Sequence, residues 1–235
     1  MEFNETKPTA LKILDVVTIL LFAAATWQVL FNTPVEATMG AVQKVFYFHV
    51  AAGWLGMLAF LAAAVTGIVY LRTSDFKWDT ASLAAVELGI VFSLINIVTG
   101  SIWARPIWNT WWTWDPRLVT ATITELIYAA YLMLRQGLEN PAQRARFGAV
   151  YAILGFISVP ISFFSIRIWR TIHPVVVGSN DPEALGSFNM SPDMRTTLFV
   201  SLFVFTVLFV DLYWNRIRMG RLGDKVEQLR LKLMA

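Results

Sequence analysis

Long, nearly uninterrupted runs of apolar residues, separated by short polar segments, dominate the chain. A helix rises about 1.5 Å per residue, so about 20 apolar residues cross the ~30 Å hydrocarbon core of a bilayer. Six runs have about this length, at roughly 11–31, 47–71, 82–103, 118–135, 147–168 and 196–214. They are continuously apolar rather than alternating, which favours helices over a β-barrel. The pattern therefore predicts an all-α integral membrane protein, a bundle of six transmembrane helices.

The two ends of the chain differ from these runs. The first ten residues include the acids Glu2 and Glu5 and lack the basic start of a secretory signal, so we expect the first run to be retained as a membrane helix. After the sixth run the chain becomes charged, and apolar residues recur at steps of three and four, which predicts an amphipathic helix. We expect a membrane domain over 1–214 and a tail helix over 215–235. The tail either lies on the membrane surface or docks a cytoplasmic partner.

The distribution of charge predicts the orientation. Only 15% of the residues are charged, against about 25% in a typical soluble domain. Of the 19 Lys and Arg residues, six fall on one side of the predicted membrane: Lys44, Arg105, Arg117, Arg167, Arg170 and Arg195. The other 13 share the side of the termini. Basic loops stay inside, so both termini are predicted to be cytoplasmic, and the net charge of +3 needs no nucleic-acid partner.

Few residues in this chain can carry metal or redox chemistry. There are no cysteines, which excludes disulfides, iron–sulfur clusters, thiolate metal ligands and thioether attachment of haem. The two histidines, His49 and His173, both fall on the predicted outer side. Each could be an ordinary hydrogen-bonded side chain. Two imidazoles from separate segments also suit the two axial positions of a haem iron, whereas zinc prefers three or four protein ligands.

The stretch WARPIWNTWWTWDPR, residues 103–117, is the most distinctive part of the sequence. It contains five tryptophans and is predicted to lie at the outer surface: Trp103, Trp108, Trp111, Trp112 and Trp114. Indole rings commonly form a belt at the membrane interface. They can equally provide a rigid platform for a flat aromatic ligand. Composition alone leaves both interpretations open.

Three charged residues lie within or beside the tryptophans. Asp115 precedes Pro116 at the start of an apolar run, which is typical of a helix N-cap followed by proline at the first helical position. Arg105 and Arg117 bracket the stretch. They could reach lipid phosphates, or they could pair with the carboxylates of a ligand, because a guanidinium matches a carboxylate bidentately.

Three further residues interrupt the apolar runs. Glu125 and Asn96 are polar positions inside predicted helices. An intramembrane carboxylate is a functional candidate by default, although a neutral Glu125 with a hydrogen bond across the bundle would also explain it. Pro160 is predicted to kink the fifth run and free a carbonyl near Phe156.

These motifs together resemble a known family. GSIWARPIWNTWWTWDPRL resembles the tryptophan-rich "WWD" signature of the haem-handling proteins of cytochrome c biogenesis. YFHVAAGW around His49 and RTIHP around His173 are similar to the family's two histidine segments. Six helices and two histidines look like the short CcmC type rather than the longer CcmF and CcsA types. Asn109 stands where the family commonly has glycine.

The resemblance implies a function. Haem b, bound transiently and non-covalently, would rest on the tryptophans and Asp115 with His49 and His173 as axial ligands. Arg105 and Arg117 are the candidates for binding its propionates. The resemblance also implies a bacterial inner-membrane location with the site facing the periplasm. Implied partners are a membrane-anchored haem chaperone of the CcmE type, transporter subunits of the CcmA and CcmB type and a single-helix CcmD-type subunit.

Other functions remain as alternatives. A haem lyase component would be expected to need more than two histidines. A cytochrome b that carries electrons across the membrane would need haem ligands at two depths, whereas both histidines are predicted at one face. A transporter that moves haem or another ligand through the bundle is harder to exclude, since Glu125 and Asn96 could line its path. We therefore expect a non-enzymatic haem-handling protein.

Overall fold

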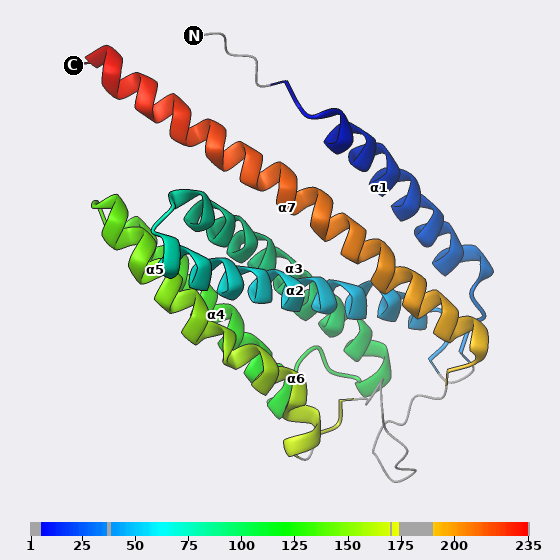
Figure 1. The fold of residues 1–235 in the computed structure, drawn as a ribbon. Coiled ribbons are helices and arrows are strands. Elements are labelled where there is room, and N and C mark those ends of the chain that lie inside the picture. The colour runs from blue at the N-terminus through cyan, green and yellow to red at the C-terminus, as the bar shows by residue number, and fades with distance from the viewer. Residues whose placement is uncertain (1–5, 37–38, 170, 174–189, 235) are drawn as a thin grey trace.

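The computed structural model describes residues 6–36, 39–169, 171–173 and 190–234. All named elements in these residues are helices (Figure 1). They are α1 (Thr9–Trp27), the short π-helix η1 (Gln28–Asn32), α2 (Gln43–Thr73), α3 (Phe76–Trp108), α4 (Pro116–Gln136), α5 (Pro141–Phe156), α6 (Ser158–Ile168) and α7 (Pro192–Met234).

Six helical segments in the described residues are long and apolar enough to cross a membrane. α1 with η1 forms the first, α5 with α6 forms the fifth, and α2, α3, α4 and α7 form the others. The predicted all-α, six-span architecture is confirmed. α1 begins and α7 ends at the same end of the bundle, which we call the terminal end (Figure 1). α2 begins and α3 ends at the opposite end, which we call the far end.

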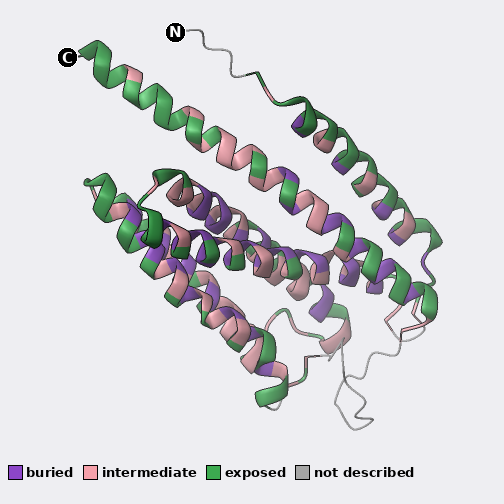
Figure 2. Ribbon diagram, in the orientation of Figure 1, coloured by how far each residue is buried: buried purple, intermediate pink, exposed green. Residues whose placement is uncertain are grey.

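α2 and α3 form the centre of the bundle, and small residues let them approach closely. Gly56 on α2 faces the backbone of Ser93 on α3, and Gly89 on α3 accommodates the ring of Phe60. Phe60 in turn stacks on Tyr128 of α4 with ring centroids 3.7 Å apart. Between membrane helices such close packing supplies the attraction that the hydrophobic effect supplies in water. Buried residues accordingly concentrate on α2 and α3, whereas α1 and the outer faces carry exposed apolar side chains (Figure 2).

The fifth span is interrupted, as predicted. α5 ends at Phe156 and α6 begins at Ser158, so the break lies just before Pro160. Proline has no N–H to donate, and its ring clashes with the preceding turn, which accounts for an interruption at this point. Beyond the break, α6 continues the span and packs against α4.

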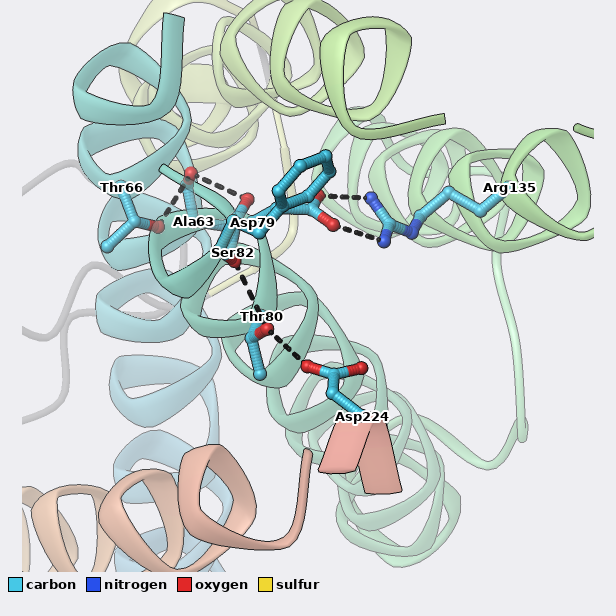
Figure 3. Close-up of polar contacts among 8 residues, drawn as sticks. Ala63, Thr66, Asp79, Thr80, Ser82, Arg135 and Asp224 are labelled. Carbon is cyan, nitrogen blue, oxygen red and sulfur yellow. Dashed lines mark hydrogen bonds and ion pairs between the residues drawn. The ribbon is translucent and has the colours of Figure 1, made fainter. Parts of the chain in front are cut away.

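Polar contacts at the terminal end tie α3 to α4 and α7. Arg135 of α4 binds Asp79 of α3 through two bonds of 2.6 and 2.8 Å (Figure 3). Thr80 of α3 donates to Asp224 of α7 at 3.3 Å (Figure 3). These residues border a cavity of about 370 Å³.

The charged tail belongs to the same continuous helix as the last span, since α7 extends over 43 residues. Arg216, beyond the apolar run, pairs with Glu87 of α3 at 2.6 Å. Farther along, Val226 and Leu233 are 64% and 87% exposed. The helix predicted for the tail is present, while the division into a membrane domain and a tail domain stays a prediction.

Candidate functional site

The far end of the bundle contains two cavities that share four side chains: His49, Asn96, Arg117 and His173. The first, of about 50 Å³, lies towards the end of α3. It is also lined by Ile97, Gly100, Ser101, Trp103, Ala104, Trp108, Trp112, Leu118 and Ala121. The second, of about 300 Å³, lies among α2, α6 and α7, and its further lining is mainly apolar. Both histidines therefore face one continuous region, although they are 124 positions apart in sequence.

His49 lies nearly two turns inside α2, and α3 fixes its ring. Its Nδ1 lies 2.9 Å from the backbone carbonyl oxygen of Asn96. A carbonyl oxygen can only accept a hydrogen bond, so this contact suits the tautomer with the proton on Nδ1, in which the Nε2 lone pair is available. Metal-binding histidines are commonly held in this way, with one ring nitrogen donating to a carbonyl and the other free for the metal.

Two residues of α3 complete the support of His49. The side-chain amide of Asn96 donates to the carbonyl oxygen of His49 at 2.8 Å. A Cβ added at Gly100 would lie 2.8 Å from Cε1 of His49, so glycine leaves the room that the ring occupies. Asn96 thus forms hydrogen bonds with α2. Glu125 accepts a hydrogen bond from Ser93 on α3, as one of the two sequence interpretations of this carboxylate held.

The tryptophan-rich stretch divides into two sets. Trp103, Trp108 and Trp112 line the first cavity, and the rings of Trp103 and Trp108 meet edge to face with centroids 5.1 Å apart. Trp111 and Trp114 do not line it and are 58% and 84% exposed. Trp103 and Trp108 lie at the end of α3, whereas the other three tryptophans follow the helix, so the fold of the segment after α3 decides which of those three rings faces the cavity. Both the ligand-platform and the interfacial-belt interpretations thus have suitable residues in this stretch.

α3 ends at a residue with left-handed backbone conformation. Asn109 has φ 54° and ψ 26°, a region that glycine enters freely and asparagine more readily than other residues. Asparagine therefore tolerates the backbone conformation that ends α3. Arg105 donates to the backbone and side-chain oxygens of Asn109 at 2.6 and 2.7 Å and lies over the ring of Trp111.

The two candidate arginines differ in position. Arg105 is exposed, stabilises the end of α3 and lines neither cavity. Arg117 lines both cavities and donates to the hydroxyl and backbone oxygens of Ser162 on α6. A guanidinium in a mostly apolar cavity is suited to a carboxylate ligand. The geometry therefore favours Arg117 over Arg105 for such a contact.

Asp115 is the N-cap of α4, as predicted. Its Oδ1 accepts from the backbone N–H of Arg117 at 2.9 Å, and Pro116 occupies the first helical position. The carboxylate also accepts from the Thr171 hydroxyl at 2.6 Å and from the Ile172 N–H at 3.0 Å. Asp115 thus connects the tryptophan-rich stretch to the segment that carries His173, and it does not line either cavity.

Several features of this site do not follow from the sequence alone. By sequence Asn96 is an intramembrane polar residue, and nothing adjacent to it indicates its contact with His49. The one sequence signal is the spacing of Asn96, Thr99 and Gly100, which places all three on one face of α3. Nothing in the sequence marked Ser162 or the larger cavity beside α6 and α7. Within the described residues, no group of three or more His, Cys, Asp or Glu side chains could hold a metal ion.

Comparison with known proteins identifies the family. The sequence profile of Heme exporter protein C (CcmC) matches residues 1–232. Heme exporter protein C of Bradyrhizobium diazoefficiens is 31% identical over 215 residues, which cover 91% of this chain and 80% of the relative. The protein of the same name from Paracoccus denitrificans is 32% identical over 189 residues, 80% of this chain and 77% of the relative. A putative ccmC-like mitochondrial protein of cytochrome c biosynthesis from Marchantia polymorpha is 28% identical and covers 84% and 83% of the two chains. The chain with the two-histidine cavity at its far end therefore belongs to the Heme exporter protein C family.

Proposed function

We propose that this protein binds haem at the outer face of the bacterial inner membrane and delivers it to a membrane-anchored chaperone of the CcmE type for cytochrome c maturation. The observation that carries the proposal is the region where His49 and His173 line the same two cavities. Haem is cargo in this proposal, bound without covalent attachment and passed on.

The residues of the site fit this ligand. His49 and His173 supply the two axial nitrogens, and the Nδ1 contact with Asn96 leaves Nε2 of His49 free for the iron. The apolar edges of the macrocycle would extend into the two cavities on either side. Arg117 is the candidate for a propionate carboxylate. Among the described residues, the buried indole N–H of Trp103 has no hydrogen-bond partner, so a ligand acceptor would satisfy it.

The charge distribution supports an outward-facing site. The sequence places 13 basic residues on the side of the two termini, which is the terminal end of the bundle. Basic loops of a membrane protein stay in the cytoplasm. Both termini are then cytoplasmic and the histidines face the periplasm. Transporter subunits of the CcmA and CcmB type and a CcmD-type helix are the other expected partners.

The absorption spectrum of the purified protein with haem tests the axial assignment. Wild type is expected to give a six-coordinate, low-spin spectrum, because two imidazoles bind the iron. His49→Ala and His173→Ala should each remove one ligand and shift the spectrum towards the five-coordinate, high-spin form. Unchanged spectra in both variants would refute the assignment of these histidines.

A second titration tests the arginine. Arg117→Gln should weaken haem binding, because it removes the cation that lines both cavities. Arg105→Gln is the matched control, since that side chain stabilises the end of α3 outside the cavities. If Arg117→Gln binds haem as tightly as Arg105→Gln does, Arg117 is not the propionate partner.

One observation favours the transport alternative. A third cavity, of about 50 Å³, shares Asn96 and Arg117 with the site and extends along α2 and α3 to Phe60. If haem crosses the bundle by this path, the protein alone, reconstituted in vesicles, should move haem from the vesicle interior to the outer site. If haem arrives by another route, loading from inside will require the transporter subunits.

A further inference from the structure

The segment that carries His173 is attached to the start of α4 through one carboxylate. Asp115 is 9% exposed and accepts hydrogen bonds from Thr171 and Ile172, the two residues before His173. The Thr171 hydroxyl in turn accepts from the backbone N–H of His173 at 3.0 Å. A hydroxyl has one proton and two lone pairs. It can therefore donate to Asp115 and accept from His173 at the same time, which forms a continuous chain from carboxylate to histidine.

Capping alone does not account for this arrangement. A helix N-cap needs one side-chain oxygen that accepts from the first turn. Asp75 has this role at α3, where its Oδ1 accepts from the Lys77 N–H at 3.0 Å and its side chain is 44% exposed. Asp115 makes the equivalent bond to Arg117 at 2.9 Å and, in addition, binds two donors from a segment 56 and 57 residues away.

The charge of Asp115 makes these bonds strong. Hydrogen bonds to a carboxylate are shorter and about twice as strong as those between neutral groups. Both oxygens of Asp115 lie 2.6 Å from the Thr171 hydroxyl, and Oδ2 lies 3.0 Å from the Ile172 N–H. The backbone leading to His173 is therefore fixed relative to α4. Since Arg117 on α4 lines both cavities with His173, the same contact sets the position of the imidazole relative to the guanidinium.

We propose that Asp115 is a positioning residue that holds His173 over the cavity it shares with His49. Asp115 acts through Thr171 and does not contact the ligand. The inference rests on the proposed function, in which His173 is an axial ligand of haem. In this role Asp115 positions the second axial ligand and is not part of the surface on which haem lies.

Two variants test this role without removing the helix cap. Asp115→Asn keeps one oxygen for the cap, because asparagine is an equally good N-cap residue. It replaces the other oxygen by an NH₂ donor that cannot accept from Ile172, and it removes the negative charge that strengthens the bond from Thr171. Thr171→Val removes the hydroxyl and leaves Asp115 intact. Asp75→Asn is the matched control, since it makes the same change at a cap of α3 away from the site.

Haem titrations with and without imidazole provide the measurement. Asp115→Asn and Thr171→Val should bind haem roughly tenfold more weakly, as expected for the loss of a hydrogen bond to a charged group. Their spectra should contain a five-coordinate fraction that added imidazole converts to the six-coordinate form, as in His173→Ala. Asp75→Asn should titrate like wild type.

The outcomes separate this inference from the proposed function. If His173→Ala changes the spectrum but Asp115→Asn and Thr171→Val do not, His173 is a ligand and the positioning role is wrong. If Asp115→Asn lowers affinity, imidazole does not restore the spectrum and Thr171→Val is normal, Asp115 acts elsewhere and the inference is overturned. If His173→Ala itself leaves the spectrum unchanged, the proposed function fails at its axial assignment.

Discussion

Replacement of Gly100 by alanine is the most direct test of how α3 supports His49. The added Cβ would lie 2.8 Å from Cε1 of the imidazole, whereas 3.4–4 Å is ordinary contact. The ring cannot simply turn away, because its Nδ1 is bound to the Asn96 carbonyl at 2.9 Å. Either that bond lengthens or α2 and α3 separate, and both changes move Nε2 from its position in the cavity.

The magnitude follows from the cost of overpacking. Adding a methyl group to a well-packed site costs about 1–3 kcal/mol. If this cost falls on the bound state, haem affinity decreases about 5- to 150-fold, since about 1.4 kcal/mol corresponds to a factor of ten. If the helices separate instead, the cost appears as a lower melting temperature of the haem-free protein and affinity changes less.

Haem titration followed by absorbance, together with thermal unfolding of the haem-free protein, distinguishes these results. Gly56→Ala is the matched control, because it lies at the same α2–α3 contact and its Cβ would meet the Ser93 nitrogen at 3.4 Å. The control is expected to differ little from wild type. If Gly100→Ala matches wild type in affinity, spectrum and melting temperature, the described contact between α3 and His49 is wrong.

Two further predictions concern the terminal end and the tryptophans. Arg135→Met should destabilise the protein by about 3–5 kcal/mol, because it leaves the carboxylate of Asp79, 12% exposed, without its partner. Lys77→Met is the control: it breaks an ion pair with Asp75 in which the lysine is 53% exposed, and it should cost less than about 1 kcal/mol. Equal losses of stability in the two variants, measured by thermal unfolding, would contradict the prediction. Trp112→Leu should weaken haem binding more than Trp114→Leu, because Trp112 lines the cavity and Trp114 is 84% exposed. The reverse order in a haem titration would exclude the cavity as the haem-binding surface.

Much of the architecture could be predicted because it depends on local properties of the chain. A membrane helix satisfies its own backbone hydrogen bonds, so a continuous apolar run of sufficient length specifies a span without reference to its neighbours. The break before Pro160 and the Asp115 cap of α4 are equally local, since each follows from the chemistry of adjacent residues. The WWD resemblance identified the family for the same reason, because the motif is contiguous in sequence.

The arrangement of the site depends on contacts between distant segments, which the sequence does not specify. The rotation of α3 against α2 decides that Asn96 meets His49 and that Gly100 faces its ring. The fold of the segment after α3 decides that Trp112 lines a cavity whereas Trp111 and Trp114 are exposed. Arg117 and Arg105 are the same residue type in one stretch of sequence, and it is tertiary contacts, such as that of Arg117 with Ser162 on α6, that distinguish them.

Asp115 illustrates both contributions. The sequence alone determined that it caps a helix, because an aspartate before proline at the start of an apolar run satisfies N–H groups a few residues away. Only the tertiary structure showed that the same carboxylate binds Thr171 and Ile172, since those residues come near it through the folding of α4, α5 and α6. Local chemistry fixes where helices begin, and helix packing decides which side chains share a site.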